Sequence, residues 1–369
     1  MFRTILFLSY TIPGIYLFVR IWQLFIPRGS RLPYILIFAI LFSIYPAGML
    51  LSDGDANRTG QILETTAGYL LPFFLYLFLL MLLTDILLLL NLILKIISHD
   101  RIGQRSLRRK VFLAIICLSA AVVIAGIINF NTIRTTGYKI SVPARSSEIK
   151  KLRIAFVSDF HLGEATPVKF VERFVKEIGI IKPDLMLYGG DIAEGGREDE
   201  KMKRFENLLS SIRTKYGSYG VLGNHEHYAG QDKGTFFSKA GINILRDTVI
   251  VIDNSFALAG RKDSHERNRK NIGEIMKSAP DSLPVILLDH RPTEIEEVSK
   301  TNADIQLSGH THKGQLFPIN LITNKVYLLH YGYRKSGNTH FFVSSGIRLW
   351  GPPVRTTGKS EILVIDVTF

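Results

Sequence analysis

Residues 153–163 read Arg-Ile-Ala-Phe-Val-Ser-Asp-Phe-His-Leu-Gly, and the rest of the chain can be organised around this stretch. Mostly apolar side chains fill 152–157 and give way abruptly to Ser158, Asp159 and His161. This pattern is typical of a buried strand that delivers polar groups to the edge of a sheet. Alone, such a pair is more often a turn carboxylate and a surface imidazole. At the ligand-binding edge of an open α/β sheet, however, Asp159 and His161 can share one metal ion.

The same kind of ending follows four more apolar, strand-like runs. The polar residues at these ends are Asp191, Asn224, His225, Glu226, Asp289, His290, His310 and His312. Brought to one sheet edge, the five ends offer about eight nitrogen and oxygen ligands, which suit two ions about 3.5–4 Å apart better than one tetrahedral ion. Since no cysteine is among them, we expect two divalent ions (Mn, Fe or Zn) at a hydrolytic centre and not a structural zinc site.

Glycine precedes the polar residue at three of these ends, at Gly190, Gly223 and Gly309. A residue without a side chain lets the backbone turn sharply and approach an ion closely. These glycines therefore support the interpretation of the strand ends as one metal site.

The chain has 369 residues and a formal net charge of +13, yet its mean hydropathy is +0.18. The apolar residues gather in 1–130, whereas 151–369 have an ordinary globular composition. Basic charge can mean nucleic acid, anionic lipid or an anionic substrate. Because no zinc-finger, RNP or helix-turn-helix signature is present, we expect membrane and phosphate and no nucleic acid partner. The single cysteine, Cys117, gives no disulfide framework and does not decide the compartment.

Four apolar stretches are long enough to cross a bilayer, which takes about 20 helical residues. They cover 5–26, 32–51, 67–97 and 111–130. A cleaved signal peptide is disfavoured for the first, because no small-residue cleavage site follows it and three more spans come next. We expect a transmembrane region over 1–130, an extended linker over 131–150 and one domain over 151–369.

Charged residues near these spans suggest an orientation and one internal contact. Loops 27–31 and 98–110 are basic, while loop 52–66 carries Asp53, Asp55 and Glu64 against a single arginine. The positive-inside rule then predicts a multi-pass protein of the cytoplasmic membrane, with the C-terminal domain on the outer, periplasmic face. Basic residues after the last span argue for the opposite side. Within the spans, Arg20 and Asp85 indicate either an ion path or, as we favour, a structural pair between packed helices.

Strand-like and helix-like runs alternate in the second half of the chain, which predicts an α/β sandwich with mixed sheets. We expect a helix over 167–178 with Thr166 as its cap, and a second over 201–212. The expected strands are 152–157, 184–188, 219–222, 249–252, 256–259, 285–288, 305–307, 341–345 and 362–367.

The polar motifs, taken in chain order, resemble those of the calcineurin-like metallophosphoesterases. They are D-x-H (159–161), G-D (190–191), G-N-H-E (223–226), a single H (290) and G-H-T-H (309–312). The stretch 345–355, followed by Glu361 and Ile362, is similar to the bacterial membrane-anchored branch of that superfamily. The resemblance covers roughly 150–369 and implies an α/β fold with four layers, an α-β-β-α sandwich metallophosphoesterase domain.

The resemblance also implies a role for each matching residue. One metal ion would be held by Asp159, His161, Asp191 and His312, and the other by Asp191, Asn224, His290 and His310. His225 would protonate the leaving oxygen. Glu194, at a position where aspartate is common in the family, would pair with His225 as the second catalytic residue.

The implied activity is hydrolysis of a phosphate ester by attack of a metal-bridged hydroxide. Membrane attachment favours a phosphorylated substrate of the cell envelope or a lipid-linked one, either a phosphodiester or a pyrophosphate. One alternative is a pyrophosphatase of the UDP-diacylglucosamine type, which needs the domain in the cytoplasm. A further alternative, from another class, is an inactive metal-binding sensor module. Neither the natural substrate nor the oligomeric state follows from the sequence.

Two other segments of the sequence could contact the membrane or the substrate. The basic run 261–270 could dock on lipid head groups, although a solvated loop is the more common explanation. The insertion 320–340, which follows the last motif, could contact the part of the substrate that carries no phosphate.

Overall fold

The computed structural model describes residues 2–51, 58–194, 199–228 and 234–369. The chain forms two compact units. The first comprises 1–128 together with 351–356, and the second comprises 129–350 together with 357–369. Asp53 and Asp55, on which the expected orientation partly depends, lie outside the described residues.

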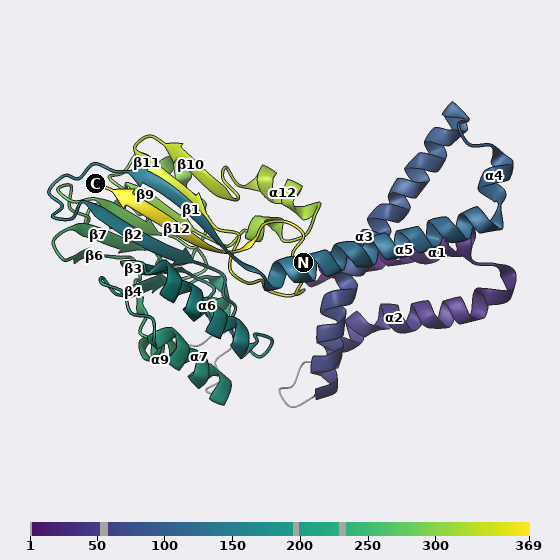
Figure 1. The fold of residues 1–369 in the computed structure, drawn as a ribbon, viewed down its shortest axis with the longest axis horizontal. Helices are drawn as coiled ribbons and strands as arrows, with labels where there is room; N and C mark the ends of the chain where they lie inside the picture. Colours follow the sequence, from purple (N-terminus) through teal and green to yellow (C-terminus); the bar gives the residue numbers. More distant parts are fainter. Residues whose placement is uncertain (1, 52–57, 195–198, 229–233) are drawn as a thin grey trace. The chain divides into compact units, whose positions relative to one another are not determined.

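The first unit is helical (Figure 1). Its elements are α1 (Phe2–Phe25), η1 (Arg28–Ser30), α2 (Arg31–Leu51), α3 (Arg58–Leu94), α4 (His99–Gly103) and most of α5 (Arg105–Asn131). Among the described residues, three helical stretches are long and apolar enough to cross a membrane: Arg28–Leu51, Arg58–Leu94 and Arg105–Asn131. The sequence predicted four spans. The first, 5–26, begins among side chains outside the described part and is not one of the three.

Polar groups inside the helical unit are paired with one another. The guanidinium of Arg20 in α1 binds the carboxylate of Asp85 in α3, and the hydroxyl of Tyr16 donates to the same carboxylate at 2.7 Å. Leu17 and Met81 are buried among the same helices. Because the two charges neutralise each other between packed helices, the arrangement is that of a structural pair.

The second unit contains two six-stranded mixed sheets. The first has the order β1 (Ile133–Ser141), β12 (Ser360–Thr368), β2 (Lys151–Val157), β3 (Leu185–Gly189), β4 (Ser218–Val221) and β5 (Asn243–Ile244). The second has the order β10 (Gly332–Ser336), β11 (Thr339–Val343), β9 (Ile305–Ser308), β8 (Val285–Leu288), β7 (Phe256–Gly260) and β6 (Thr248–Ile252). In the first sheet, β3 pairs in parallel with β2 on one side and β4 on the other. In the second, β8 pairs in parallel with β7 and with β9.

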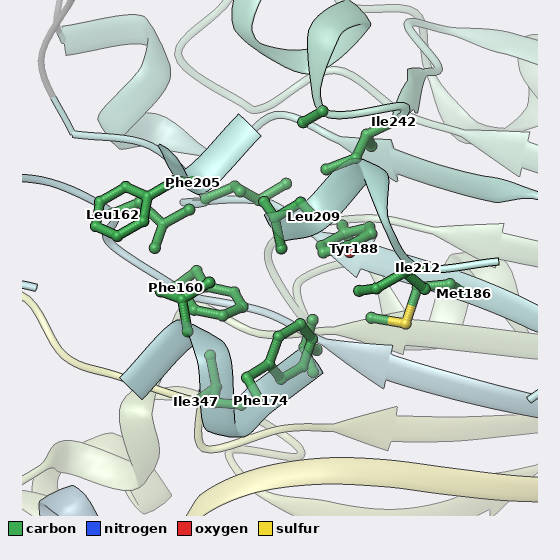
Figure 2. Packing of buried hydrophobic residues seen from close by; sticks show 14 of the residues in the cluster. Phe160, Leu162, Phe174, Met186, Tyr188, Phe205, Leu209, Ile212, Ile242 and Ile347 are labelled. Carbon is green, nitrogen blue, oxygen red and sulfur yellow. The ribbon is translucent and has the colours of Figure 1, made fainter. Parts of the chain in front are cut away.

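Helices cover the outer faces of the two sheets. The first sheet is covered by α6 (Val168–Ile181), α7 (Glu200–Ser210) and α9 (Gly234–Lys239), and the second by α10 (Ile272–Met276) and α11 (Ile295–Val298). The remaining helical segments of this unit are α8 (Asn224–Tyr228), η2 (His312–Gly314) and α12 (Ile319–Val326). Phe174 of α6 and Phe205 of α7 pack on one outer face with Tyr188 of β3, as Figure 2 shows. Ile275 of α10 packs on the other.

Side chains of β2 alternate between two cores, as expected for a strand covered on both faces. Ala155 and Val157 point to the helix-covered face, whereas Ile154 and Phe156 lie between the sheets with residues of β7, β8 and β9. Four layers result, in the order helices, sheet, sheet, helices. The α-β-β-α sandwich predicted for this domain is confirmed.

Two local features differ in detail from the sequence predictions. The helix expected over 167–178 is α6, which begins at Val168 with Pro167 as its N-cap. Thr166, the expected cap, donates instead to the carbonyl of His161 at 2.9 Å. Proline at this position presets the backbone angle, and Thr166 braces the preceding loop. In the expected linker, residues 133–141 are extended but form β1, which pairs in parallel with β12.

Candidate metal centre

Each predicted metal-binding residue follows the carboxyl end of a central strand. Asp159 and His161 follow β2, and Asp191 follows β3. Asn224 begins α8 directly after β4. In the second sheet, His290 follows β8, and His310 and His312 follow β9. Because β2, β3 and β4 are parallel, as are β8 and β9, their carboxyl ends lie at one edge of each sheet.

The structure brings six of these residues, all except Asn224, together into overlapping clusters of potential ligands. Within each cluster the ligand atoms lie within 4.8 Å of one another. The clusters are Asp159, His161 and His312; Asp191, His290 and His310; and His161, Asp191 and His225. Asp191 and His161 each belong to two of them, so the clusters form one continuous site. This is the geometry that a shared, bridging carboxylate requires.

The polar atoms in the site fit a pair of cations. Nε2 of His161 and Oδ1 of Asn224 are buried and have no hydrogen-bond partner among the described residues. Buried polar atoms are ordinarily paired, so unpaired lone pairs that converge on acidic neighbours are suited to metal ions. Nitrogen and oxygen donors of this kind match Mn, Fe or Zn.

Contacts behind the ligands fix which nitrogen of each imidazole faces the site. Nδ1 of His290 donates to the carbonyl of Gly189 at 2.7 Å, which leaves Nε2 directed at Asp191, 3.2 Å from its Oδ2. Such hydrogen bonds orient a metal-binding histidine. Burial and the neighbouring His290 lower the pKa of His310 to about 3, so His310 is a neutral imidazole ready to coordinate.

Five candidate ligands adopt an uncommon backbone conformation. Positive φ angles of 48° to 69° occur at Asp159, His161, Asp191, His310 and His312. Residues other than glycine adopt this left-handed conformation uncommonly, and such strain clusters at functional sites. Five of the seven predicted ligands adopt it here. Surrounding strands and hydrogen bonds therefore hold these side chains in positions that the local backbone would not choose.

Two of the glycines leave space that the ligands occupy. A Cβ atom on Gly223 would overlap Oδ1 of Asp191, and one on Gly309 would overlap Oδ2 of Asp159. Neither glycine has a positive φ, so the requirement is steric. The absence of a side chain lets two strand ends approach the carboxylates closely.

Glu226 has a role that the sequence did not reveal. Its buried carboxylate accepts hydrogen bonds from the backbone N–H groups of Asp191, Ile192, Ala193 and Gly223, at 2.6–3.0 Å. It thereby ties the loop after β3 to the loop after β4. The only hint in the sequence was that Glu226 follows Gly223, at the end of a strand, by three residues. The sequence does not show that its carboxylate points at backbone N–H groups.

Glu194 connects a candidate ligand to the candidate acid. Its Oε1 lies 2.5 Å from Nδ1 of His161 and 2.8 Å from Nδ1 of His225. Burial raises the pKa of Glu194, but the two imidazoles outweigh this and lower it to about 2. Because an ionised carboxylate only accepts hydrogen bonds, both Nδ1 atoms carry protons. Burial in turn lowers the pKa of His225, and Glu194 and Asp191 more than reverse this, so that it is raised.

The site is accessible from one side. The side chains of Asp159 and His290 are fully buried, whereas those of His225 and His312 are 16 % exposed and that of Glu194 is 33 % exposed. Exposed aromatic rings lie beside His225, with the centroid of Trp350 at 5.8 Å. A substrate would therefore reach the ligands past His225.

The basic run 261–270 and Asp289 form ion pairs with each other. In the basic run 261–270, Arg261 and Arg269 are directed inward to Asp289, with nitrogen–oxygen distances of 3.2 and 2.8 Å. Asp289 therefore points away from the candidate ligands although it adjoins His290. Since Arg261 is only 2 % exposed, it is not available to lipid head groups.

A fold of two mixed sheets with carboxylates, imidazoles and an amide at the strand ends is that of the metallophosphoesterases. Residues 152–314 match the family model of the calcineurin-like phosphoesterases. Residues 152–314 therefore form a domain that is similar to the calcineurin-like phosphoesterases.

Relatives with similar descriptions occur in bacteria and animals. An uncharacterized metallophosphoesterase of Helicobacter pylori is 34 % identical over 58 % of this chain and 59 % of its own length. One from Campylobacter jejuni is 28 % identical over 73 % of each chain. A protein of Danio rerio named transmembrane protein with metallophosphoesterase domain is 26 % identical over 74 % of this chain and 67 % of its own. The chain thus spans about three fifths of the Helicobacter relative.

Proposed function

We propose that this protein is a membrane-attached, metal-dependent phosphoester hydrolase. The observation that carries the proposal is the convergence of six candidate ligands with His225, whose Nδ1 is held by Glu194. Asp159, His161, Asp191 and His312 would hold one divalent cation, and Asp191, Asn224, His290 and His310 the other. Two cations bound there would neutralise a phosphoryl group and supply an activated water.

His225 is proposed to act as the general acid. Its Nδ1–H donates to Glu194, so the ring is held with Nε2 available to a leaving oxygen. Glu194 also keeps the imidazole protonated, because it helps to raise the pKa of His225. Partial exposure of His225 gives the leaving group a route out of the site.

Membrane attachment bears on the class of substrate. With three apolar helices in the described part of the chain, the phosphoesterase domain would work next to a bilayer. We propose an envelope or lipid-linked phosphodiester or pyrophosphate as the substrate, and the outer face of the cytoplasmic membrane as the location. A UDP-diacylglucosamine-type pyrophosphatase would instead need the domain in the cytoplasm. Reporter fusions at the C-terminus separate the two locations, because a cytoplasmic signal would contradict our orientation.

Hydrolysis of a soluble bis-aryl phosphate ester by the full-length protein with Mn²⁺ tests the activity. We expect Asp191→Asn and His225→Ala to abolish it, because the first removes the bridging carboxylate and the second the proton donor. Asp281→Asn, an exposed position outside the site, is the matched control and should retain activity. Unchanged hydrolysis in both site variants would refute the mechanism. Stoichiometric binding of metal without hydrolysis of monoester, diester or pyrophosphate would favour a sensor module.

A further inference from the structure

An apolar surface on the phosphoesterase domain remains unaccounted for by the metal centre. In the described part of 129–369, eleven large apolar side chains are exposed, and six of them fall between positions 317 and 328. We call these six the α12 face: Phe317, Ile319, Leu321, Ile322, Val326 and Leu328. Their exposed fractions run from 40 % to 68 %. Isolated apolar residues on a surface are ordinary, but a contiguous group marks an interaction site.

Four residues of the α12 face belong to α12, and Phe317 and Leu328 flank the helix on either side. The backbone N–H of Ile319 donates to Leu316 at 2.8 Å, and that of Tyr327 closes the last turn on Thr323 at 3.1 Å. A Cβ atom on Gly314 would lie 2.5 Å from Cα of Asn320, so the helix packs closely on the segment that carries His312. The face is therefore held beside the metal centre.

The charged residues that flank α12 in the sequence have one sign. From 305 to 360 the chain has no aspartate or glutamate, while it has seven lysines and arginines. Of these, Lys325, Arg334 and Lys335 are exposed close to α12 in the sequence. An apolar helical segment flanked by exposed cations matches the two layers of an anionic membrane surface, acyl chains below and phosphate groups above.

We propose that the α12 face docks on the surface of an anionic lipid bilayer. A second copy of this chain is the less suitable occupant, since it would bring the exposed Lys325, Arg334 and Lys335 of two copies together. The proposal rests on membrane attachment and is independent of whether the domain hydrolyses phosphate esters. Docking would place the metal centre at the level of lipid head groups, because the ring of Tyr327, at the end of α12, lies 6.4 Å from that of His310.

A fluorescent label in the full-length protein tests the proposal. With Cys117→Ser as background, Ile322→Cys is labelled with an environment-sensitive dye, and the protein is reconstituted into vesicles of phosphatidylcholine and phosphatidylglycerol. Val251→Cys is the matched control, because Val251 is also an aliphatic residue and is 49 % exposed. It lies on β6, the edge strand opposite β10 in the second sheet. Doxyl-labelled lipids then quench any dye that reaches the acyl chains.

We expect the dye at position 322 to shift to shorter wavelength and lose most of its emission to doxyl lipid, while the dye at position 251 does neither. Replacing phosphatidylglycerol by phosphatidylcholine, or adding Lys325→Glu, should weaken the quenching because the electrostatic attraction is lost. Equal emission from both positions in water-like surroundings would overturn docking. Energy transfer between labelled copies without doxyl quenching would overturn it in favour of self-association.

Discussion

Oε1 of Glu194 lies 2.8 Å from Nδ1 of His225, and the same oxygen contacts Nδ1 of His161 at 2.5 Å. One carboxylate thus orients a proposed metal ligand and the proposed acid together. Since both imidazoles donate to one atom, a change at Glu194 is expected to affect catalysis before it affects the fold. The side chain is one third exposed, so its removal leaves no large internal cavity.

The pH dependence of kcat should reveal the link between Glu194 and His225. His225 must be protonated to act as an acid, so activity is lost as pH rises through its pKa, which Glu194 helps to raise. Replacing Glu194 by glutamine removes that charge, and the alkaline limb of kcat should move to lower pH. Glu194→Asp keeps a carboxylate and should therefore keep part of the raised pKa of His225. The exposed Glu297→Gln is the control, and an alkaline limb that stays in place in Glu194→Gln would contradict the assignment.

Glu226 is predicted to stabilise the loops that present Asp191. Its two carboxylate oxygens accept four backbone N–H groups, and glutamine can accept on only one side of its amide. We therefore expect Glu226→Gln to lower the free energy of unfolding by about 2–3 kcal/mol, through donors left buried and unsatisfied. Thermal unfolding and Mn²⁺ titration measure the two consequences. A variant with native stability and native metal affinity would show that the four hydrogen bonds are replaceable.

Candidate ligands could be proposed from the sequence because every central strand is a short apolar run that ends abruptly in a polar residue. Asp159, Asp191 and His310 could be placed at a common edge for that reason alone. The direction of a side chain after such an end depends on backbone angles that carry no sequence signal. Glu226, directed at backbone N–H groups, and Asp289, directed at arginines, therefore looked no different from the ligands beside them.

Elements outside the central strands were harder to predict for a different physical reason. β1 is polar and only partly buried, so it lacks the apolar run that identifies a strand, and its pairing with β12 joins residues more than two hundred positions apart. The cap of α6 was misassigned because Thr166 had two possible hydrogen-bond partners. Local sequence does not decide between them.

Gly223 is predicted to be essential for metal binding, and its replacement should also lower stability because a Cβ atom would lie 2.7 Å from the backbone N of Asp191. A Cβ atom there would overlap Oδ1 of Asp191, so Gly223→Ala should displace the carboxylate and reduce Mn²⁺ affinity and activity at least tenfold, on the scale of about 1.4 kcal/mol or more. Gly179→Ala in α6 is the matched control, because a Cβ there meets nothing within 4 Å. That change should stabilise the helix by up to about 1 kcal/mol. Calorimetry of unfolding together with metal titration separates the two effects, and intact metal binding in Gly223→Ala would disprove the close approach.

Metal affinity should rise with pH because a proton occupies one ligand in the metal-free protein. Burial lowers the pKa of His290, but the carboxylates of Asp191 and Asp159 more than offset this and raise it to about 10. Below that pH the imidazole is protonated, and it must release the proton before Nε2 can coordinate. We therefore expect Mn²⁺ affinity to increase from pH 6 to pH 9, with close to one proton released per bound pair of ions at pH 8. Titration calorimetry in buffers of different ionisation enthalpy counts that proton. The same titration on His290→Asn should show weaker binding and no proton release from this position, whereas undiminished release would assign the proton to another group.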